Sequence, residues 1–169
     1  ALFQFTYMGA PMVYYGDEVA VNSPSKSSSA NGPYGDPYTR PPYPWTDQPG
    51  DPTIYGPPDT SVELFYTRLA HLRKQYPALR NGAFVTLLTG DTQQPGTAPG
   101  TYAFARMPTD GPSAVVALNN SAASNTASIP VAGVFADGTQ LQDAISGATY
   151  AVNAGTIPVK LAARTGVVL

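Results

Sequence analysis

The sequence contains no cysteine and a single histidine, His71, among its 169 residues. The lack of thiols excludes a disulfide framework, a thiolate nucleophile and a cysteine-based metal site. A lone histidine excludes a histidine metal cluster and argues against a Ser-His-Asp triad on this chain. We expect His71 to have a surface or packing role, because it lies on a predicted helix.

Charge is also scarce, since only 12% of the residues are charged and the net charge is -2. Phosphate binding needs clustered Lys and Arg, and no basic run is present, so we predict no nucleic-acid partner. The longest apolar runs are too short to cross a bilayer, so we predict no membrane span. The abundance of Gly, Pro, Ser, Thr, Ala and Tyr is typical of secreted β-rich proteins of the bacterial type.

The first residues are apolar, and we interpret Ala1 as a cut or processed start. The stretch "ALFQFTYMGAP" predicts the end of an apolar helix, followed by a turn at Gly9. The next stretch, "PMVYYG", does not alternate with polar residues and therefore predicts a strand covered on both faces, as in a parallel sheet. Two carboxylates, Asp17 and Glu18, follow this strand directly.

Residues 22–59 form a long segment dense in Ser, Pro, Gly, Asp and Tyr, which predicts a loop that is functional or mobile. A helix then begins with a capping-box pattern, in which the Thr60 hydroxyl and the Glu63 side chain would satisfy each other's backbone amides. Apolar residues recur at helical spacing behind this start, and Pro77 ends the helix.

From Gly82 onward the pattern changes to short apolar or alternating runs between turn residues. Such spacing is typical of an antiparallel β-sandwich. The runs are AFVTLL, TYAFARM, AVVALNN, TASIPV, TQLQDAI, TYAVN, TIPVKLAA and TGVVL. This region also contains a glycosylation triplet, Asn119-Asn120-Ser121, of a kind that chance produces often.

Three stretches resemble the α-amylase family of glycoside hydrolases (family 13), in particular its neopullulanase-like members. "GAPMVYYGDE" resembles the segment around the eighth barrel strand, typically Gly-x-Pro-x-x-Tyr-Tyr-Gly-x-Glu. "DPYTRPPYPW" resembles the following loop pattern Asp-Pro-x-x-Arg-x-Pro-x-x-Trp, and "FYTRLAHLRKQYPALRNGAF" resembles the last barrel helix. The three stretches occur in the family's order over about eighty residues, and the strands after Gly82 would form its C-terminal domain.

The resemblance implies an α+β fragment, in which the final β/α unit of a TIM barrel precedes a mainly β, antiparallel sandwich. We place the end of the (β/α)8 barrel in residues 1–81 and the sandwich in residues 82–169. The family's Asp nucleophile, Glu acid/base and third Asp follow earlier barrel strands, and their motifs are absent from this sequence. The family's calcium site also lies upstream, so we expect no cofactor or metal in this chain and calcium only in the parent enzyme.

Asp36 and Arg40 are the strongest predicted substrate-binding residues. A carboxylate and a guanidinium on one turn can bind sugar hydroxyls as acceptor and donor, and the resemblance implies the same role. The alternative is a local ion pair that shapes the loop, and both roles are compatible. Tyr38 and Trp45 lie on the same loop, where aromatic rings either stack on sugar C–H faces or cover the protein's own apolar surface.

Asp17, Glu18 and Tyr15 are predicted supporting residues, because residues just past a barrel strand face the active site. In the structural alternative, Glu18 is held by an arginine or by backbone amides. A new active site built from carboxylates of residues 17–51 is a further alternative.

The sequence thus predicts part of a retaining, α-amylase-type glycoside hydrolase that acts on α-glucans and is inactive alone. One alternative is a starch- or maltooligosaccharide-binding module that uses the aromatic loop or the sandwich, and binding by the sandwich would need paired exposed aromatics on it. The candidates for such aromatics after Gly82 are Phe84, Tyr102, Phe104, Phe135 and Tyr150. A third interpretation is purely structural, in which the sandwich shields the barrel and binds nothing. The apolar strand and helix must be covered by the chain's own sandwich, by a second copy of the chain or by the missing N-terminal barrel portion, and we predict self-association.

Overall fold

A computed structural model describes residues 1–21, 42–45, 56–90 and 100–169. The chain forms two compact units. The β-rich unit consists of residues 1–10 and 71–169, and the other unit consists of residues 11–70. This grouping joins residues 1–10 and 71–81 to the strands. The predicted domain boundary at Asn81-Gly82 stays a prediction.

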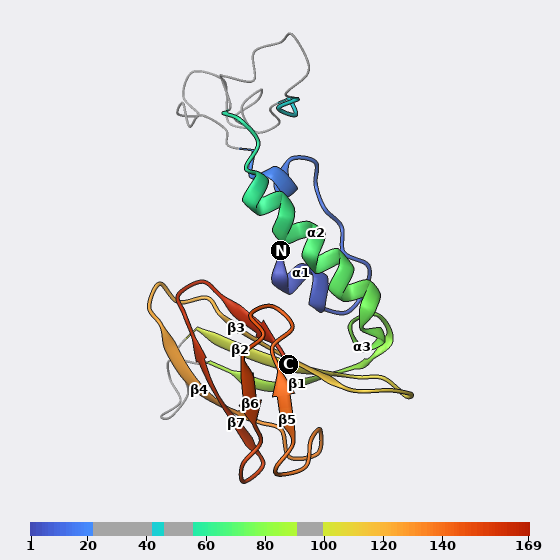
Figure 1. The fold of residues 1–169 in the computed structure, drawn as a ribbon, viewed down its shortest axis with the longest axis vertical. Coiled ribbons are helices and arrows are strands. Elements are labelled where there is room, and N and C mark those ends of the chain that lie inside the picture. Colours follow the sequence, from blue (N-terminus) through green and yellow to red (C-terminus); the bar gives the residue numbers. More distant parts are fainter. Residues whose placement is uncertain (22–41, 46–55, 91–99) are drawn as a thin grey trace. The chain divides into compact units, whose positions relative to one another are not determined.

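The described residues form helices and eight strands, and Figure 1 shows how they are arranged within the chain. The helical segments are α1 (Leu2–Thr6), the 3-10 helix η1 (Asp17–Val19), α2 (Thr60–Gln75) and α3 (Pro77–Asn81). The strands are β1 (Ala83–Thr89), β2 (Thr101–Met107), β3 (Ala114–Asn119), β4 (Asn125–Pro130), β5 (Gln140–Gln142), β6 (Thr149–Ala151), β7 (Thr156–Leu161) and β8 (Gly166–Val168). Each strand falls within, or within a residue of, one of the predicted runs, so the prediction of a mainly β region after Gly82 is confirmed. Of the described helices, none is long and apolar enough to span a membrane.

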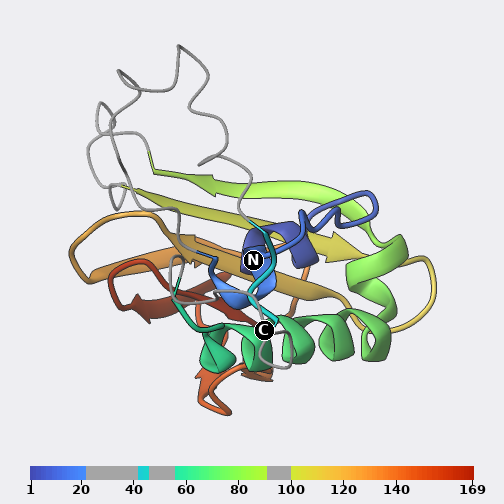
Figure 2. The same cartoon turned by 90° about the horizontal axis from the view of Figure 1, so that it is seen from above.

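All strand pairs are antiparallel. Four strands form one sheet in the order β1-β2-β3-β8, while β4 pairs with β7 and β5 with β6. Seen from above, β1, β2 and β3 run side by side (Figure 2). The result is a mostly-sheet fold, which is consistent with a sandwich-type domain.

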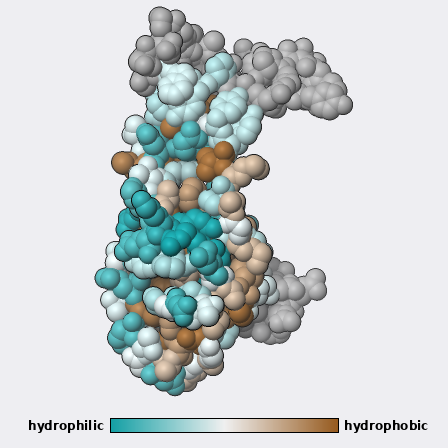
Figure 3. Space-filling view, turned by 90° about the vertical axis from the view of Figure 1, so that its right-hand side faces the viewer, coloured by the Kyte–Doolittle hydropathy of each residue, from teal (hydrophilic) through white to brown (hydrophobic). Residues whose placement is uncertain are grey.

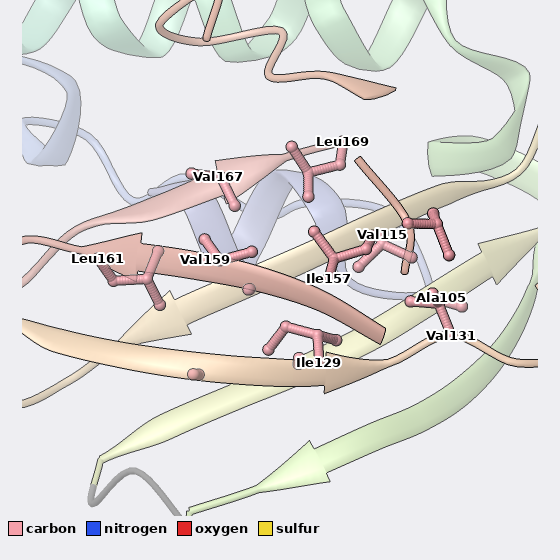
Figure 4. Packing of buried hydrophobic residues seen from close by; sticks show 13 residues of the cluster. Ala105, Val115, Ile129, Val131, Ile157, Val159, Leu161, Val167 and Leu169 are labelled. Atoms are coloured by element: carbon pink, nitrogen blue, oxygen red, sulfur yellow. The ribbon is translucent and has the colours of Figure 1, made fainter. Parts of the chain in front are cut away.

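β2 and β3 are buried on both faces of the four-stranded sheet, since successive side chains of a strand point to opposite sides and most of theirs are buried. β1, at the edge of the sheet, is mostly exposed or half-buried. Ala103 and Ala105 of β2 belong to a core cluster shared with Ile129 of β4 and Val159 of β7 (Figure 4). Phe104, which lies between the two alanines, belongs to a second cluster. Full burial of such a side chain contributes roughly 1.5–3 kcal/mol to folding.

The second cluster also contains residues of α3 and of the N-terminal segment. Ala78 and Leu79 of α3 are buried against Phe104, together with the half-buried Tyr7. The Tyr7 ring meets the Phe84 ring edge-on at a centroid distance of 4.8 Å. Residues 1–7 therefore form part of this core, and the predicted N-terminal helix and the turn at Gly9, with a φ of 86°, are both confirmed.

Arg73 of α2 ties this N-terminal segment in place. Its guanidinium donates hydrogen bonds to the carbonyl oxygens of Phe5 at 2.8 Å, Tyr7 at 3.2 Å and Leu79 at 2.6 Å, and also to that of Gly9. The last carbonyls of a helix have no partner within the helix, so a cation is favourable there. Burial lowers the pKa of Arg73.

Arg106 of β2 also donates hydrogen bonds to backbone carbonyls, one of them in this segment, and its side chain is only 1% exposed. It donates to the carbonyl oxygens of Thr6 at 2.9 Å, Gly82 at 3.2 Å and Arg80 at 3.4 Å. Burial lowers the pKa of Arg106, and the nearby positive charge of Arg73 lowers it further. Carbonyl oxygens therefore supply the hydrogen bonds that a buried charge requires.

The strand predicted for the "PMVYYG" stretch is wrong for this chain. Residues 11–14 form neither a strand nor a helix, and Met12 is 85% exposed. Val13, Tyr14 and Tyr15 are exposed as well. A strand is defined by its partners, and within the described residues no other segment pairs with this one.

The start of α2 also differs from the prediction. Asp59, not Thr60, is the N-cap: its Oδ1 accepts hydrogen bonds from the backbone N–H groups of Ser61 at 2.9 Å and Val62 at 3.3 Å. The Ser61 hydroxyl donates to the same oxygen, and the Glu63 N–H donates to the Asp59 carbonyl. The Ser61 hydroxyl, followed by the two amides, lowers the pKa of Asp59.

The glycosylation triplet is inaccessible in the folded chain. Asn119 is 2% exposed, and its Nδ2 donates to the carbonyl oxygens of Ala123 at 2.8 Å and Ala162 at 2.9 Å. Its Oδ1 accepts from the Ser121 N–H. Both amide hydrogens are used, so Asn119 stabilises a turn.

Candidate functional site

The predicted site residues divide between described and undescribed parts of the chain. Asp36, Tyr38 and Arg40 lie outside the described residues. Trp45 and the supporting residues Tyr15, Asp17 and Glu18 are described, and all belong to the unit of residues 11–70. Their substrate-binding and supporting roles stay predictions.

Glu18 lies in a tight turn that requires glycine. Gly16 has a φ of 91°, and a Cβ at this position would lie 2.7 Å from a Val21 methyl group. The Val21 N–H donates to the Gly16 carbonyl at 2.9 Å, which closes the turn around η1. The Gly16 N–H in turn donates to Glu18 Oε2 at 2.9 Å. The turn thereby fixes the Glu18 carboxylate by one of its own backbone amides.

Glu18 has a second partner from a distant part of the sequence. The Tyr43 hydroxyl forms a hydrogen bond with its carboxylate. Burial raises the pKa of Tyr43, and the charges of Glu18 and Glu63 together with this hydrogen bond raise it further. Burial and the charges of Asp17 and Glu18 also raise the pKa of Tyr66 of α2. Burial, the two carboxylate charges and the hydrogen bond therefore all favour the protonated form of Tyr43.

Trp45 packs on the Tyr43 ring. The two ring centroids are 4.5 Å apart at an interplanar angle of 43°, and the Trp45 N–H donates to the Tyr43 carbonyl at 2.9 Å. Pro44 between them is buried, whereas Trp45 is 59% exposed. The arrangement leaves part of a large aromatic ring free to contact a ligand.

The other two predicted supporting residues, Asp17 and Tyr15, have surroundings that differ from those of Glu18. Asp17 is exposed, and the Tyr15 ring packs against Tyr14 at a centroid distance of 4.6 Å. The structure thus brings Glu18 and Trp45 together through Tyr43, a connection that the sequence analysis missed. Tyr43 lies 25 residues beyond Glu18, and no spacing rule links them. Across the described residues, no group of three or more His, Cys, Asp or Glu is arranged to hold a metal ion.

The five aromatic candidates for a binding surface after Gly82 are all buried or half-buried where the structure describes them. Phe104 is fully buried, and Phe84 and Tyr102 pack beside it in the second core cluster. Phe135 and Tyr150 are half-buried against the first cluster. None of these five described aromatics offers an exposed ring face of the kind that Trp45 presents.

Known proteins resemble this chain over its whole length. An amylopullulanase from Thermoanaerobacter thermohydrosulfuricus is 30% identical over 180 residues, which covers 100% of this chain and 10% of that protein. A cyclomaltodextrinase from a Bacillus species is 34% identical over 83 residues, covering 49% of this chain and 12% of the relative. The chain is a homologue of part of the glycoside hydrolase family 13 enzymes. No family model matches it.

Solved structures agree with this assignment. A debranching enzyme from Nostoc punctiforme is 26% identical with a TM-score of 0.60, covering 99% of this chain and 29% of that protein. An Anoxybacillus α-amylase has a TM-score of 0.72 at 23% identity, covering 99% of this chain and 30% of the α-amylase, and shows the likeness of fold alone. The chain spans about a tenth of the length of the curated relatives that it matches.

Proposed function

We propose that this chain is the end of the catalytic barrel and the C-terminal β-domain of a secreted, retaining α-glucan hydrolase of the α-amylase type. The observation that carries the proposal is the match of the whole chain to an amylopullulanase at 30% identity. The order of the three motifs supports it. So do the names of the relatives, which include a cyclomaltodextrinase and a debranching enzyme.

The loop of residues 22–59 would supply substrate binding. In this proposal Asp36 and Arg40 bind the hydroxyls of one glucose unit, and Tyr38 lies beside them. Trp45, with its exposed ring, would stack on a sugar face. The ligand would be an α-glucan or a maltooligosaccharide.

Catalysis would belong to the parent enzyme. A retaining mechanism needs a nucleophile and an acid/base carboxyl group about 5 Å apart, and the family's motifs for both are absent from this sequence. Calcium, where the parent binds it, would also lie in its other part. The isolated chain would therefore bind but not hydrolyse glucan.

The unit of residues 11–70 would need a partner surface. Val13, Tyr14 and Leu64 are exposed large apolar residues, and Leu64 is 70% exposed. Hydrophobic atoms are also visible at the surface in Figure 3. We assign this surface to the remaining barrel portion of the parent, and expect the isolated chain to self-associate through it. Sedimentation velocity would show a fraction of dimer that increases with protein concentration. A monomer at every concentration would contradict this expectation.

Product analysis tests the proposal directly. The purified chain and its Asp36→Ala/Arg40→Ala variant would each be incubated with maltoheptaose and soluble starch, and the products separated by chromatography. We expect no product from either protein. Product from the unchanged chain alone would show that carboxylates of residues 17–51 form a working site, which would overturn the assignment of catalysis to the parent enzyme.

The alternative is a carbohydrate-binding module, and the exposure of Trp45 favours the loop over the β-rich unit as its binding surface. Native gels containing starch distinguish the two surfaces. Retardation that Trp45→Ala abolishes would assign binding to the loop. Retardation that survives this change would assign it to the strands.

A further inference from the structure

Exposure alone does not make a tryptophan a binding platform, because an unrestrained indole loses rotational freedom when a ligand orders it. Trp45 is restrained in two ways. Its ring packs on Tyr43 at 4.5 Å, and its backbone N–H is bonded to the Tyr43 carbonyl. The orientation of Trp45 therefore depends on what fixes Tyr43.

Tyr43 is held in place by Glu18, which lies in the turn that begins at Gly16. Its hydroxyl is bonded to the Glu18 carboxylate, which also accepts the Gly16 N–H. A carboxylate can accept about four hydrogen bonds, so one side chain can serve both donors. The chain of contacts thus runs from a rigid glycine turn, through a carboxylate and a phenol, to the exposed indole.

We propose that Glu18 is a positioning residue for a pyranose-binding platform: it fixes Tyr43, and Tyr43 holds the Trp45 ring ready to stack on a glucose unit. The identity of the ligand rests on the proposed function, because that function makes α-glucan the substrate. Pyranose rings present apolar C–H faces, and a pre-oriented aromatic ring binds such a face at lower entropic cost. Glu18 contacts no sugar in this arrangement.

The restraint can be measured without any ligand. Trp45 is the only tryptophan of the chain, so fluorescence excited at 295 nm reports on it alone. We expect its anisotropy to fall in Glu18→Ala and in Tyr43→Phe. It should stay near the original value in Glu18→Gln, whose amide oxygen still accepts the phenol hydrogen. Glu63→Gln is the matched control, because Glu63 places a charge near Tyr43 from the first turn of α2.

Ligand affinity is measured on the same proteins by calorimetric titration with maltoheptaose. We expect Trp45→Ala to lose binding and Glu18→Ala and Tyr43→Phe to weaken it about five-fold, as one lost hydrogen bond predicts. Glu18→Gln and Glu63→Gln should stay within about two-fold of the unchanged chain.

The outcomes separate the two proposals. Unchanged anisotropy and affinity in Glu18→Ala and Tyr43→Phe, with binding lost in Trp45→Ala, would overturn the positioning role and leave the glucan-binding loop intact. No maltoheptaose binding by the unchanged chain, or equal binding by Trp45→Ala, would overturn the platform itself. Hydrolysis is judged separately by the product analysis, so neither result decides the catalytic assignment.

Discussion

Arg106 donates a 2.9 Å hydrogen bond to the backbone carbonyl of Thr6, a residue 100 positions earlier in the chain. Together with the three carbonyls of residues 1–10 that Arg73 bonds, those of Phe5, Tyr7 and Gly9, this contact attaches the N-terminal segment to the strands. In the intact chain, residues 1–10 are therefore structurally part of the β-rich unit.

Replacing Arg106 by methionine should destabilise the β-rich unit by about 2 kcal/mol or more, because three carbonyl oxygens lose their donor inside the protein. Urea unfolding followed by circular dichroism measures the change. The exposed Lys160→Met on β7 is the control and should change stability by less than about 0.5 kcal/mol. If Arg106→Met and the unchanged chain have the same free energy of unfolding, burying the charge of Arg106 destabilises the fold as much as its hydrogen bonds stabilise it.

A chain that begins at Gly82 should not fold cooperatively, although the sequence places a domain boundary there. It would lack Leu2, Tyr7, Ala78 and Leu79, which cover Phe104 and its neighbours. We expect binding of a hydrophobic dye and a broad thermal transition. A sharp transition without dye binding would show that the strands alone suffice.

Asp59→Ala should accelerate hydrogen exchange at the Ser61 and Val62 amides, whereas Thr60→Ala should leave it unchanged, because Asp59 is the observed cap. The lowered pKa of Asp59 adds a pH dependence. Its contribution is present above the unfolded-state pKa, near 3.9, and is lost as the pH falls through the lower folded-state value. Faster exchange in Thr60→Ala alone would favour the predicted capping box.

Alkaline titration should report the Glu18–Tyr43 contact. The pKa of Tyr43 is raised by burial and by Glu18 and Glu63, so its stabilising effect is complete below the unfolded-state pKa, near 10, and is lost as the pH rises through the folded-state value. Ionised Tyr43 should quench the adjacent Trp45.

We expect the midpoint of this quenching to move to lower pH in Glu18→Gln, and the transition to disappear in Tyr43→Phe. An unchanged midpoint in Glu18→Gln would contradict the contact. Fluorescence excited at 295 nm between pH 8 and 12 measures both.

The strands were predictable because local alternation and turn residues mark them without knowledge of their partners. β2 and β3 were found as apolar runs, and their burial on both faces explains why Phe104 reads as core. The helix end at Pro77 was predictable for a similar reason, since proline acts on its own immediate backbone.

The features that the sequence analysis mispredicted or missed depend on distant residues or on a choice between adjacent caps. The stretch at residues 11–15 has strand composition, but a strand also needs neighbours. The cap was misassigned because Asp59 and Thr60 are both good caps, and the Glu63 pattern favoured the wrong one. The link from Glu18 to Tyr43 depends on a fold that no local pattern specifies.

The double burial of β2 and β3 has a consequence for protein engineering. Neighbouring positions such as Phe104 and Ala105 belong to different cores but share one backbone, so repacking either core shifts the other. Substitutions on opposite faces should therefore show epistasis although their side chains never touch. A combinatorial library that varies one face alone will contain few stable variants. A library that varies both faces together allows a substitution in one core to compensate for a backbone shift caused by a substitution in the other.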